Sequence, residues 1–477
     1  MNIEKRLINY IKNKRAINMS KKYNQETIVN HLKNYGFVYA NSEIYNGLSN
    51  TWDYGPLGVN LKNNLKKLWW KEFITKDKNL VGLDSMILLN PMVWQASGHL
   101  SNFSDPLIDC KNCKNRFRAD KLIEEVDPTI QVSEKTTNDE IQRILQSLHL
   151  VCPNCHTFAW TEVRNFNLMF KTFQGTVENN STEVYLRPET AQGIFINFKN
   201  VLRTTRAKLP LGIGQIGKSF RNEITPGNFI FRTREFEQME IEFFCHEEQA
   251  LSWFDFYLNK IHDFLTTTCN LRVDNFKLKE HSKEELSHYS KRTVDYIYNF
   301  PHGWGELWGL AYRTDFDLKT HMEYSKKDLE YLDPITNQKY IPHVVEPSVG
   351  VERLMYAICC DAYDEEILAD NDTRIVMHLN YCLAPYKVCV LPLTNKLKDL
   401  ALEIFDTLLA NGIECCYDAA GSIGKRYRRQ DAIGTPYCLT VDFDSLENQT
   451  VSIRDRDSMQ QVILKIVDLP QFFLKLN

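Results

Sequence analysis

The sequence predicts an α+β fold built around an antiparallel sheet, followed by a smaller α/β domain at the C-terminal end. Within 212–244, two apolar runs are separated by the turn residues Pro226, Gly227 and Asn228, which is typical of two paired strands. From Tyr386 onward, strand and helix patterns alternate, and this indicates the separate α/β domain. The 477 residues, 43% of them hydrophobic, are enough for roughly two to four domains.

Shifts in composition predict the domain boundaries. The main domain is expected over 23–380 and the α/β domain over 381–477. The main domain is expected to carry two insertions: a polar segment at 106–165, flanked by paired cysteines, and a mostly helical, connective segment at about 246–300.

The first 22 residues are strongly basic, and we expect them to form a disordered N-terminal extension. A natural start at Met19 and a transit peptide are the other interpretations of this segment. The formal charge of −4 excludes a wholly basic nucleic-acid-binding surface, so such contacts must come from local patches.

The absence of a long apolar run predicts a soluble protein. No window approaches the roughly 18–20 apolar residues that span a bilayer. Most of the 13 cysteines stand singly in apolar runs, which favours reduced thiols in the cytoplasm.

Several local patterns predict individual elements of the main domain. Helical spacing is seen at 28–35 and 59–73, and the run 85–94 has strand character that Pro91 interrupts, as in an edge or interface strand. Residues 183–202 predict a strand, a turn and a helix, and a strand before Gly350 is followed by a helix.

The strongest chemical signal is "FRNE", a loop, and then "RTREFEQME". Activation of a carboxylate by ATP needs cations at the phosphate where negative charge develops, and arginine supplies bidentate donors. Arg221 is the candidate, and Arg232 lies on the far side of the loop. Phe236 offers a flat face for a purine, and its even spacing with Glu240 and Glu242 predicts that the three project from one face of a strand. Two surface strands with salt-bridged arginines are the alternative.

A second signal is "GVERL". Gly350 allows close approach of a ligand to the backbone, and Arg353, one turn into the helix, can reach a triphosphate or stack on adenine. This pattern is weak alone and gains its value from the preceding one.

Together with the expected helix and strand that end at Pro91, these two segments resemble the three signature motifs of class II aminoacyl-tRNA synthetases. Further runs, including "SEIYNGLSNTWDYGPLG", "LRPETAQGIF" and "EPSVGVERL", resemble the dimeric, bacterial-like glycyl-tRNA synthetase family over nearly the whole chain after Met19. The resemblance implies a class II catalytic domain at 23–380 and an anticodon-binding domain at 381–477. It also implies a homodimer that activates glycine with ATP and Mg²⁺ and transfers it to tRNA-Gly.

The resemblance also assigns site residues. It implies catalytic roles for Arg221, Glu223 and Arg353. The expected ATP contacts are Arg221, Asn222, Glu223, Phe231, Arg232, Thr233, Arg234, Glu235, Phe236, Glu306, Leu307, Gly350, Val351, Glu352 and Arg353. The expected glycine contacts are Arg118, Glu189, Phe236, Glu237, Gln238, Met239, Glu240, Glu346, Pro347, Ser348, Val349 and Gly350.

A glutamate cluster suits glycine, which has no side chain to hold. Carboxylates can bind its ammonium while filled space excludes the Cβ of any larger amino acid. The expected reaction needs no protein nucleophile, because the substrate carboxylate attacks the α-phosphorus while Arg221, Arg353 and Mg²⁺ neutralise charge. Each glutamate could instead be a structural ion-pair partner.

Two Cys-x-x-Cys pairs flank the first insertion. Cys110, Cys113, Cys152 and Cys155 have the spacing of two knuckles around a tetrahedral, structural Zn²⁺. Such a metal would stabilise a segment that is expected to bury little core, with His156 as a bystander. Unliganded thiols are the alternative.

A basic run in the last domain is the candidate tRNA surface. It comprises Lys425, Arg426, Arg428 and Arg429, with Arg454 and Arg456 nearby. These cations would contact phosphates and position the tRNA without reading its bases, whereas a solvated helix face is the other interpretation.

Two rival functions share parts of these patterns. A threonyl or prolyl enzyme would share the three motifs and the C-terminal domain, but is not expected to carry "TWDYGPLG" or "RPETAQGIF". A non-catalytic polymerase accessory subunit would have lost the chemistry, and the presence of Arg221, Glu223 and Arg353 argues against it.

Overall fold

The structure is a computed structural model, and it describes residues 23–130, 132, 136–283, 285–287, 289–368 and 372–476. The expected N-terminal extension, 1–22, lies outside the described residues. The chain divides into two compact units. One contains the described residues of 1–31, 362–379 and 386–477, and the other contains 32–361 and 380–385.

The larger unit is built on a seven-stranded sheet. Its strand order is β11-β12-β13-β16-β10-β9-β3, and every pairing is antiparallel except that of β3 with β9. The strands are β3 (Leu80–Gly82), β9 (Leu211–Phe220), β10 (Glu235–Cys245), β11 (Phe276–Glu280), β12 (Arg292–Phe300), β13 (Gly303–Thr314) and β16 (His343–Gly350). The predicted antiparallel α+β core is confirmed.

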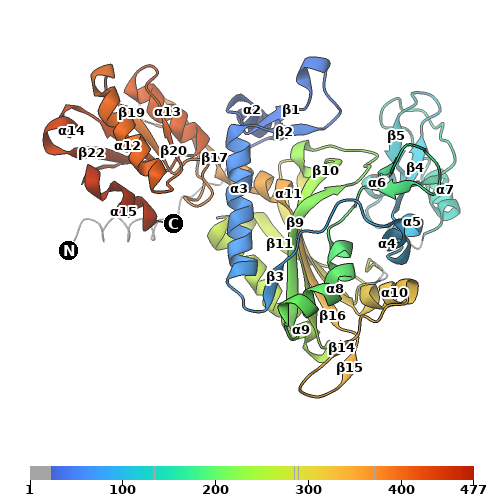
Figure 1. Cartoon of the computed structure of the whole chain (residues 1–477). Helices are drawn as coiled ribbons and strands as arrows, with labels where there is room; N and C mark the ends of the chain where they lie inside the picture. The colour runs from blue at the N-terminus through green and yellow to red at the C-terminus, as the bar shows by residue number, and fades with distance from the viewer. Residues whose placement is uncertain are drawn as a thin grey trace. The chain divides into compact units, whose positions relative to one another are not determined.

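Helices cover both faces of this sheet (Figure 1). On one face, α8 (Ala191–Thr205) and α10 (Phe316–Ser325) pack on Phe244 and Val344 through Phe195, Phe198 and Leu318, all of them buried. On the other face, α9 (Glu247–Asp263) packs on Phe243 through Trp253 and Tyr257, with ring centroids 4.5 and 5.4 Å apart. Alternation along β10 therefore gives two apolar faces, and polar side chains on either face occupy special positions.

Further elements belong to the unit of the main sheet. They are α2 (Gln25–Asn34), which begins in the other unit, and β1 (Val38–Ala40), β2 (Trp52–Tyr54), α3 (Pro56–Trp70), α4 (Pro91–Ala96), α5 (His99–Asn102), β7 (Lys171–Phe173), β8 (Glu183–Tyr185), β14 (Tyr331–Leu332), β15 (Lys339–Tyr340) and α11 (Val351–Ala362).

The first insertion forms a lobe with its own core (Figure 1). Its elements are β4 (Ser104–Asp109), β5 (Arg116–Arg118), α6 (Ala119–Val126), α7 (Asn138–Ser147) and β6 (Arg164–Asn167), with the strand order β5-β4-β6. The expectation that this segment buries little core is wrong. Ile108, Ile123, Ile141 and Leu145 are fully or almost fully buried, because α6 and α7 are both amphipathic.

Two sequence-based assignments of elements are corrected. The run 85–94 is not an edge strand: Pro91 is the first residue of α4, and the side chain of Asn90 caps that helix by accepting a hydrogen bond from Met92 N at 2.9 Å. The segment 246–300 is helical only in its first part, because β11 and β12 are strands of the main sheet.

The smaller unit contains a five-stranded mixed sheet with the order β20-β19-β21-β22-β23. Its elements from 386 onward are β19 (Val388–Pro392), α12 (Lys398–Ala410), β20 (Cys415–Tyr417), α13 (Ile423–Ile433), β21 (Tyr437–Val441), α14 (Phe443–Asn448), β22 (Thr450–Asp455), β23 (Gln461–Lys465) and α15 (Leu469–Leu474). The hairpin β17 (Tyr363–Ile367) and β18 (Thr373–Met377) also belongs to this unit. The predicted strand–helix alternation after Tyr386 is confirmed.

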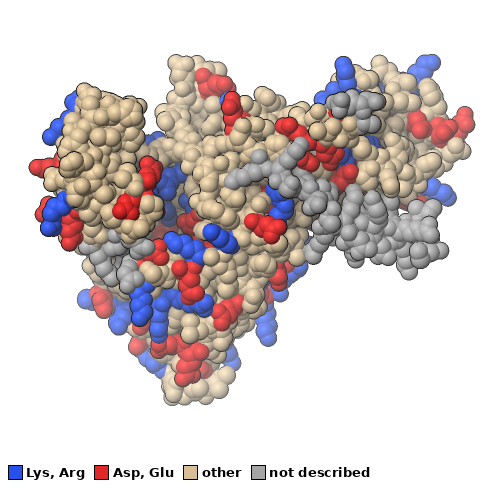
Figure 2. Space-filling view, turned by 180° about the vertical axis from the view of Figure 1, so that it is seen from behind, with Lys and Arg blue, Asp and Glu red and all other residues tan. Residues whose placement is uncertain are grey.

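The surface carries charges of both signs. In Figure 2, lysine and arginine side chains are interspersed with aspartate and glutamate side chains over the visible face. This distribution matches the small net charge of −4. Among the described residues, no helix combines the length and the apolar character that crossing a bilayer requires.

Candidate active site

A pocket of about 260 Å³ lies on the sheet face that carries Glu240, Ser348 and Phe236. Its walls come from β10, β13 and β16 and from the loop 224–234. Glu240 is paired in register with Ser348 across β10 and β16, so the two strands present these side chains together. The predicted projection of Phe236 and Glu240 to one face of a strand is what the geometry shows.

The structure brings many of the sequence-predicted residues together around this pocket. Those that line it are Glu189, Arg221, Glu223, Phe231, Arg232, Thr233, Phe236, Gln238, Glu240, Glu306, Leu307, Glu346, Ser348, Gly350, Glu352 and Arg353.

Other predicted residues do not line the pocket. They are Arg118, Asn222, Arg234, Glu235, Glu237, Met239, Pro347, Val349 and Val351. Strand alternation accounts for most of them, because Met239 and Val349 are buried on the opposite face and Glu237 forms ion pairs with Lys62 and Lys66. Arg118 is held in the insertion lobe by Asp105 at 2.9 Å and by Asp120 at 2.6 Å.

The pocket also contains residues that the sequence did not single out. These are Ile230, His281, Ser287, Tyr289, Thr293, Asp295, Gly309, Leu310, Ala311 and Arg313. Arg313 had a detectable signal, since it is a lone cation at the end of the apolar strand run "LWGLAYR". Gly309, Leu310 and Ala311 also lie in β13, and Ile230 lies in the loop before β10. The rest come from β12 and the segment before it, whose strand pattern the helical interpretation of 246–300 conceals.

One end of the pocket is cationic and aromatic. Arg353 donates from Nε to the carbonyl of Phe231 at 3.1 Å, pairs with Glu306 at 3.2 Å, and lies 4.5 Å from the Phe231 ring centroid. The guanidinium of Arg221 lies 5.4 Å from the ring of Phe236. Partial desolvation acts to raise the pKa of Glu306, whose side chain is 54% exposed, but Arg353 and Arg221 outweigh it, so this carboxyl has a lowered pKa. The arrangement provides cations for phosphates and flat faces for a base.

The other end of the pocket is rich in carboxylates. Glu240 accepts hydrogen bonds from the hydroxyls of Thr190 and Ser348, the second at 2.7 Å, and from Gln238 at 3.3 Å. Glu346 pairs with Arg313 at 2.6 Å. Such fixed carboxylates form a receptor for a small ammonium group.

Glu189 completes this end. It accepts from Gln192 at 3.0 Å and lies 3.5 Å from Nε2 of His99. Burial acts to raise the pKa of Glu189, but His99 and Arg313 lower it by a larger amount. The pKa of this carboxyl is therefore well below its usual value, and the carboxyl is ionised at neutral pH.

The loop that borders the cationic end is fixed from the N-terminal part of the same unit. The amide of Asn50 donates to the carbonyls of Phe229 and Arg232 at 2.9 and 2.8 Å, and Trp52 contacts the Phe229 ring at 4.8 Å. Asn228 and Phe229 both adopt positive φ, which costs free energy for residues other than glycine. The contacts from Asn50 and Trp52 therefore stabilise a strained conformation of the loop.

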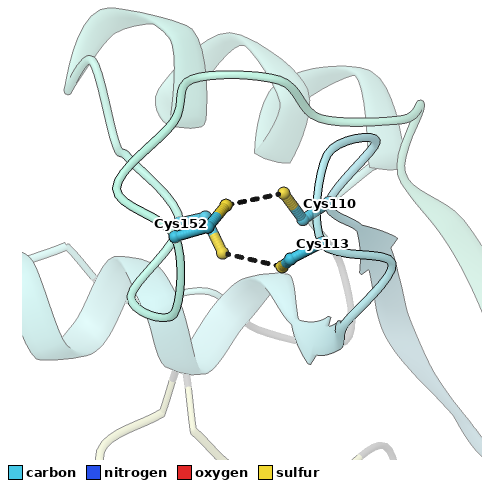
Figure 3. Close-up of side chains that lie close together, drawn as sticks. Cys110, Cys113 and Cys152 are labelled. Atoms are coloured by element: carbon cyan, nitrogen blue, oxygen red, sulfur yellow. Dashed lines mark hydrogen bonds between the residues drawn. The ribbon is translucent and has the colours of Figure 1, made fainter.

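The four cysteines of the insertion meet at one point. Figure 3 shows the sulfur atoms of Cys110, Cys113 and Cys152 facing one another from two loops. Sγ of Cys110 lies 3.5 Å from that of Cys155, and Sγ of Cys113 lies 3.7 Å from that of Cys152. All four thiol sulfurs lie within 4.8 Å of one another, so the set can hold a metal ion.

The basic run of the C-terminal unit is only partly available to a ligand. Arg426, Arg454 and Arg456 are buried, at 6%, 6% and 4% exposure, and they bind carbonyls or carboxylates of their own unit. The expectation of phosphate contacts is wrong for these three, because each supports the fold instead. Arg429 pairs with Asp418 at 2.6 Å, whereas Lys425 is exposed.

Comparison with known proteins adds family information. Residues 170–361 match the profile of the tRNA synthetase class II core domain (G, H, P, S and T). Residues 387–476 match an anticodon binding domain, and residues 105–142 match the glycyl-tRNA synthetase insertion domain 1.

Curated relatives are similar over nearly their whole length. The chain is 63% identical to a glycine–tRNA ligase of Ureaplasma urealyticum, over 94% of this chain and 95% of the relative. It is 62% identical to a glycine–tRNA ligase of Malacoplasma penetrans, over 94% and 97%, and 58% identical to one of Alkaliphilus oremlandii, over 95% and 98%.

Proposed function

Because the chain belongs to the glycine–tRNA ligase family of class II synthetases, we propose that its pocket activates glycine with ATP and that the enzyme transfers glycyl to tRNA-Gly. The observation that carries the proposal is the pairing, in one pocket, of a cationic aromatic end with a carboxylate end. The first end suits a nucleotide and the second suits an ammonium group.

At the nucleotide end, Arg221 and Arg353 are proposed to hold the phosphates, and Phe236 and Phe231 to provide faces for adenine. The carboxylate oxygen of glycine attacks the α-phosphorus, and the bond to the leaving pyrophosphate breaks. Positioning and charge neutralisation by the arginines are sufficient, because no side chain needs to form a covalent intermediate. Mg²⁺ supplies further neutralisation when it is bound with ATP, and the ionised Glu306 is the carboxylate that fits it.

At the glycine end, Glu189, Glu240 and Glu346 are proposed to surround the ammonium group. Arg313 is buried, at 3% exposure, and pairs with Glu346. It is proposed to fill the space that the side chain of an amino acid larger than glycine would need. Exclusion by overlap makes the site selective against added carbons. The 3′-terminal hydroxyl of the tRNA then attacks the glycyl carbonyl carbon, and AMP leaves.

The test is ATP–pyrophosphate exchange with each of the twenty amino acids, followed by aminoacylation of tRNA-Gly. Glycine alone should support exchange. Equal exchange with alanine or serine would contradict the pocket argument. Exchange with threonine or proline would favour the rival synthetases, and no exchange with any amino acid would favour a non-catalytic accessory protein.

We also propose that the four-cysteine cluster binds a structural Zn²⁺. Four thiolates at the usual Zn–S distance of about 2.3 Å lie about 3.8 Å apart in a tetrahedron. The two sulfur–sulfur distances of 3.5 and 3.7 Å are close to this value, so the residues fit the ion. The metal would join the loop that follows β4 to the loop that follows α7.

The working enzyme is proposed to be a homodimer that acts in the cytoplasm. An apolar surface at Met86, Leu88 and Met92, exposed at 66%, 50% and 50%, supports the dimer. Within the described residues, none of the 13 cysteines forms a disulfide bond, which supports a reducing compartment. The anticodon-binding match at 387–476 supports tRNA binding by the C-terminal unit.

A further inference from the structure

The glycine end of the pocket continues inward into a group of carboxylates that outnumber the cations they contact. Carboxylate oxygens of Glu240, Glu242 and Glu346 lie within 4.8 Å of one another. Glu240 and Glu242 are 2% and 0% exposed. Arg313 is the cation within this group, and it pairs with both Glu346 and Asp317. Carboxylates buried this closely cannot all be ionised, so the group must hold a further positive charge or a proton.

Glu242 differs from its neighbours in its hydrogen bonds. Among the described residues, neither of its carboxylate oxygens has a hydrogen-bond partner, although both are buried. Both oxygens of Glu240 are already occupied, by Thr190 at one and by Ser348 and Gln238 at the other. An unpartnered carboxylate in a buried site is costly, whereas a carboxylic acid can donate a hydrogen bond to a neighbouring acceptor.

Glu346 is the acceptor that the geometry favours. Its Oε2 accepts from Arg313 at 2.6 Å, and in the described part of the chain its Oε1 accepts no hydrogen bond from another side chain. Burial raises the pKa of Glu346 to about 8, although Arg313 acts to lower it. Glu242 has no bonded cation, so Glu346 is the first of the two to ionise, and a single proton in the pair belongs on Glu242.

Charged or titratable groups face Glu242 from the strands β10, β13 and β16, from α10 and from the segment before α8, whereas β9 places the apolar Ile213 opposite it. On the strands these are Glu240, Glu346 and Arg313. From α10 comes Asp317, which is bonded to Arg313, and beyond it lies His321, which bonds Gln192 of α8 at 2.8 Å. Glu189, just before α8, bonds Gln192 as well.

We propose that Glu242 is a positioning residue. It carries a proton at neutral pH and donates a hydrogen bond to Oε1 of Glu346. Glu346 is then held at both oxygens, by Arg313 and by Glu242, and presents one fixed negative charge to the ammonium of glycine. Burial, and to a smaller extent the negative charge of the nearby Glu346, raise the pKa of Glu242 well above its usual value, in agreement with this assignment.

The first test uses stability and does not depend on the proposed function. A carboxyl with a raised pKa in the folded state keeps its proton after the unfolded chain has lost it. The folded state therefore loses stability as pH rises from the unfolded pKa of about 4.3. Glu242→Gln cannot lose a proton, so its melting temperature relative to wild type should increase steadily from pH 5 to pH 9. Glu403→Gln in α12 is the control, because that side chain is exposed, and its difference from wild type should stay constant.

The second test uses glycine-dependent exchange and rests on the proposed function. Glu242→Gln retains a donor to Glu346 and should keep the KM for glycine within about threefold, whereas the donor-free Glu242→Met should raise it about tenfold or more. The KM for ATP should change in neither variant. If the exchange activity were absent altogether, the proposed function would fail while the stability test still decided the protonation of Glu242.

Two results would overturn the proposal. One is a constant difference in melting temperature between Glu242→Gln and wild type over pH 5–9, which would mean that Glu242 is ionised throughout. The other is stabilisation of wild type, but not of Glu242→Gln, by added Mg²⁺ or K⁺ at pH 8, which would assign the cluster to a metal ion.

Discussion

Arg313 is the residue on which the carboxylate end of the pocket depends. It binds Asp317 through two hydrogen bonds, at 2.8 and 2.9 Å, and Glu346 through one at 2.6 Å, and its side chain is 3% exposed. Arg313→Met would leave two buried carboxylates without their cation. We expect the free energy of unfolding to fall by about 3–5 kcal/mol and the KM for glycine to rise, as measured by urea denaturation and by pyrophosphate exchange.

A matched surface arginine provides the control for this prediction. Arg292 also bridges two carboxylates, Asp255 and Glu280, but its side chain is 29% exposed and both partners are at least 60% exposed. Arg292→Met should therefore cost at most about 1 kcal/mol and leave the KM for glycine unchanged. Equal losses in the free energy of unfolding of the two variants would show that burial does not strengthen the contribution of Arg313 to stability.

Two of the three arginines of the "FRNE…RTREF" segment, Arg221 and Arg234, should differ sharply in their contribution to activity. Arg221 lines the pocket, whereas Arg234 does not and supplies a backbone carbonyl that accepts from Arg221 N at 2.9 Å. Loss of a donor that stabilises charge in the transition state costs about 10²–10³ in rate. We expect Arg221→Ala to lose this much kcat in pyrophosphate exchange and Arg234→Ala to stay within a few fold. A comparable loss of kcat in Arg234→Ala would contradict this prediction and indicate that Arg234 contacts ATP.

Motifs alone could place residues in the right segment but not on the right side of a strand. Glu240 and Ser348 were predicted together with Met239 and Val349, although strand alternation puts the second pair on the opposite face. Applying the period of two to each motif would have separated them. Arg313 was missed for another reason: its partners Asp317 and Glu346 meet it only through tertiary packing.

Among the elements, the insertion lobe is the place where metal and packing act together. Its core includes Ile108, Ile123 and Trp160 together with two of the four cysteines, and the other two pack against it. We expect one Zn²⁺ per chain, and we expect Cys113→Ser to lose it and to raise amide hydrogen exchange within 105–165 while the main sheet stays protected. Metal content and hydrogen exchange measure both effects.

The control for the zinc prediction is Cys382→Ser, a substitution outside the lobe that should keep the metal. Retention of zinc in Cys113→Ser would contradict the four-thiolate site. Because the lobe has its own apolar core, partial protection after metal loss is expected, and complete unfolding of the chain is not.

Prediction of elements succeeded where periodicity was strong and failed where local composition misled it. The paired strands β9 and β10 and the helix after Gly350 follow directly from alternation and helical spacing. Residues 276–280 and 292–300 are strands because they pair with each other and with β13, and such pairing is invisible in polar, tyrosine-rich segments. The apolar run around Pro91 predicts a strand, but proline also suits the first position of a helix, and the cap at Asn90 begins a helix there.

At the scale of the whole molecule, chain order does not decide which compact unit a segment joins. Residues 362–379 lie within the predicted domain 23–380 but group with the C-terminal sheet. Arg374, whose side chain is fully buried, pairs with Asp431 at 3.2 Å and donates to the carbonyl of Arg456 at 2.8 Å. An ion pair between residues 57 positions apart leaves no local signature, so the boundary at 380 remains a prediction.

The proposed homodimer gives the last prediction. A stable interface usually buries about 1,200–2,000 Å², and a charge placed in its apolar centre is costly to desolvate. We expect light scattering to give twice the chain mass for wild type at micromolar concentration. The double variant Leu88→Glu with Met92→Glu should dissociate, whereas Ile335→Glu, at a position 81% exposed in the loop between β14 and β15, should not. A monomeric wild type, or a double variant that stays dimeric, would contradict this assignment.

Dissociation should also reduce exchange activity, because the proposed interface is linked to the pocket by packing. Met92 lies in α4, whose Val93 and Trp94 are buried against Met169. The carbonyl of Leu168, the preceding residue, accepts from Asn222 N at 2.7 Å, next to Arg221. Weaker packing of α4 would therefore shift the backbone that positions Arg221. The monomeric variant should lose kcat, whereas Ile335→Glu should keep it.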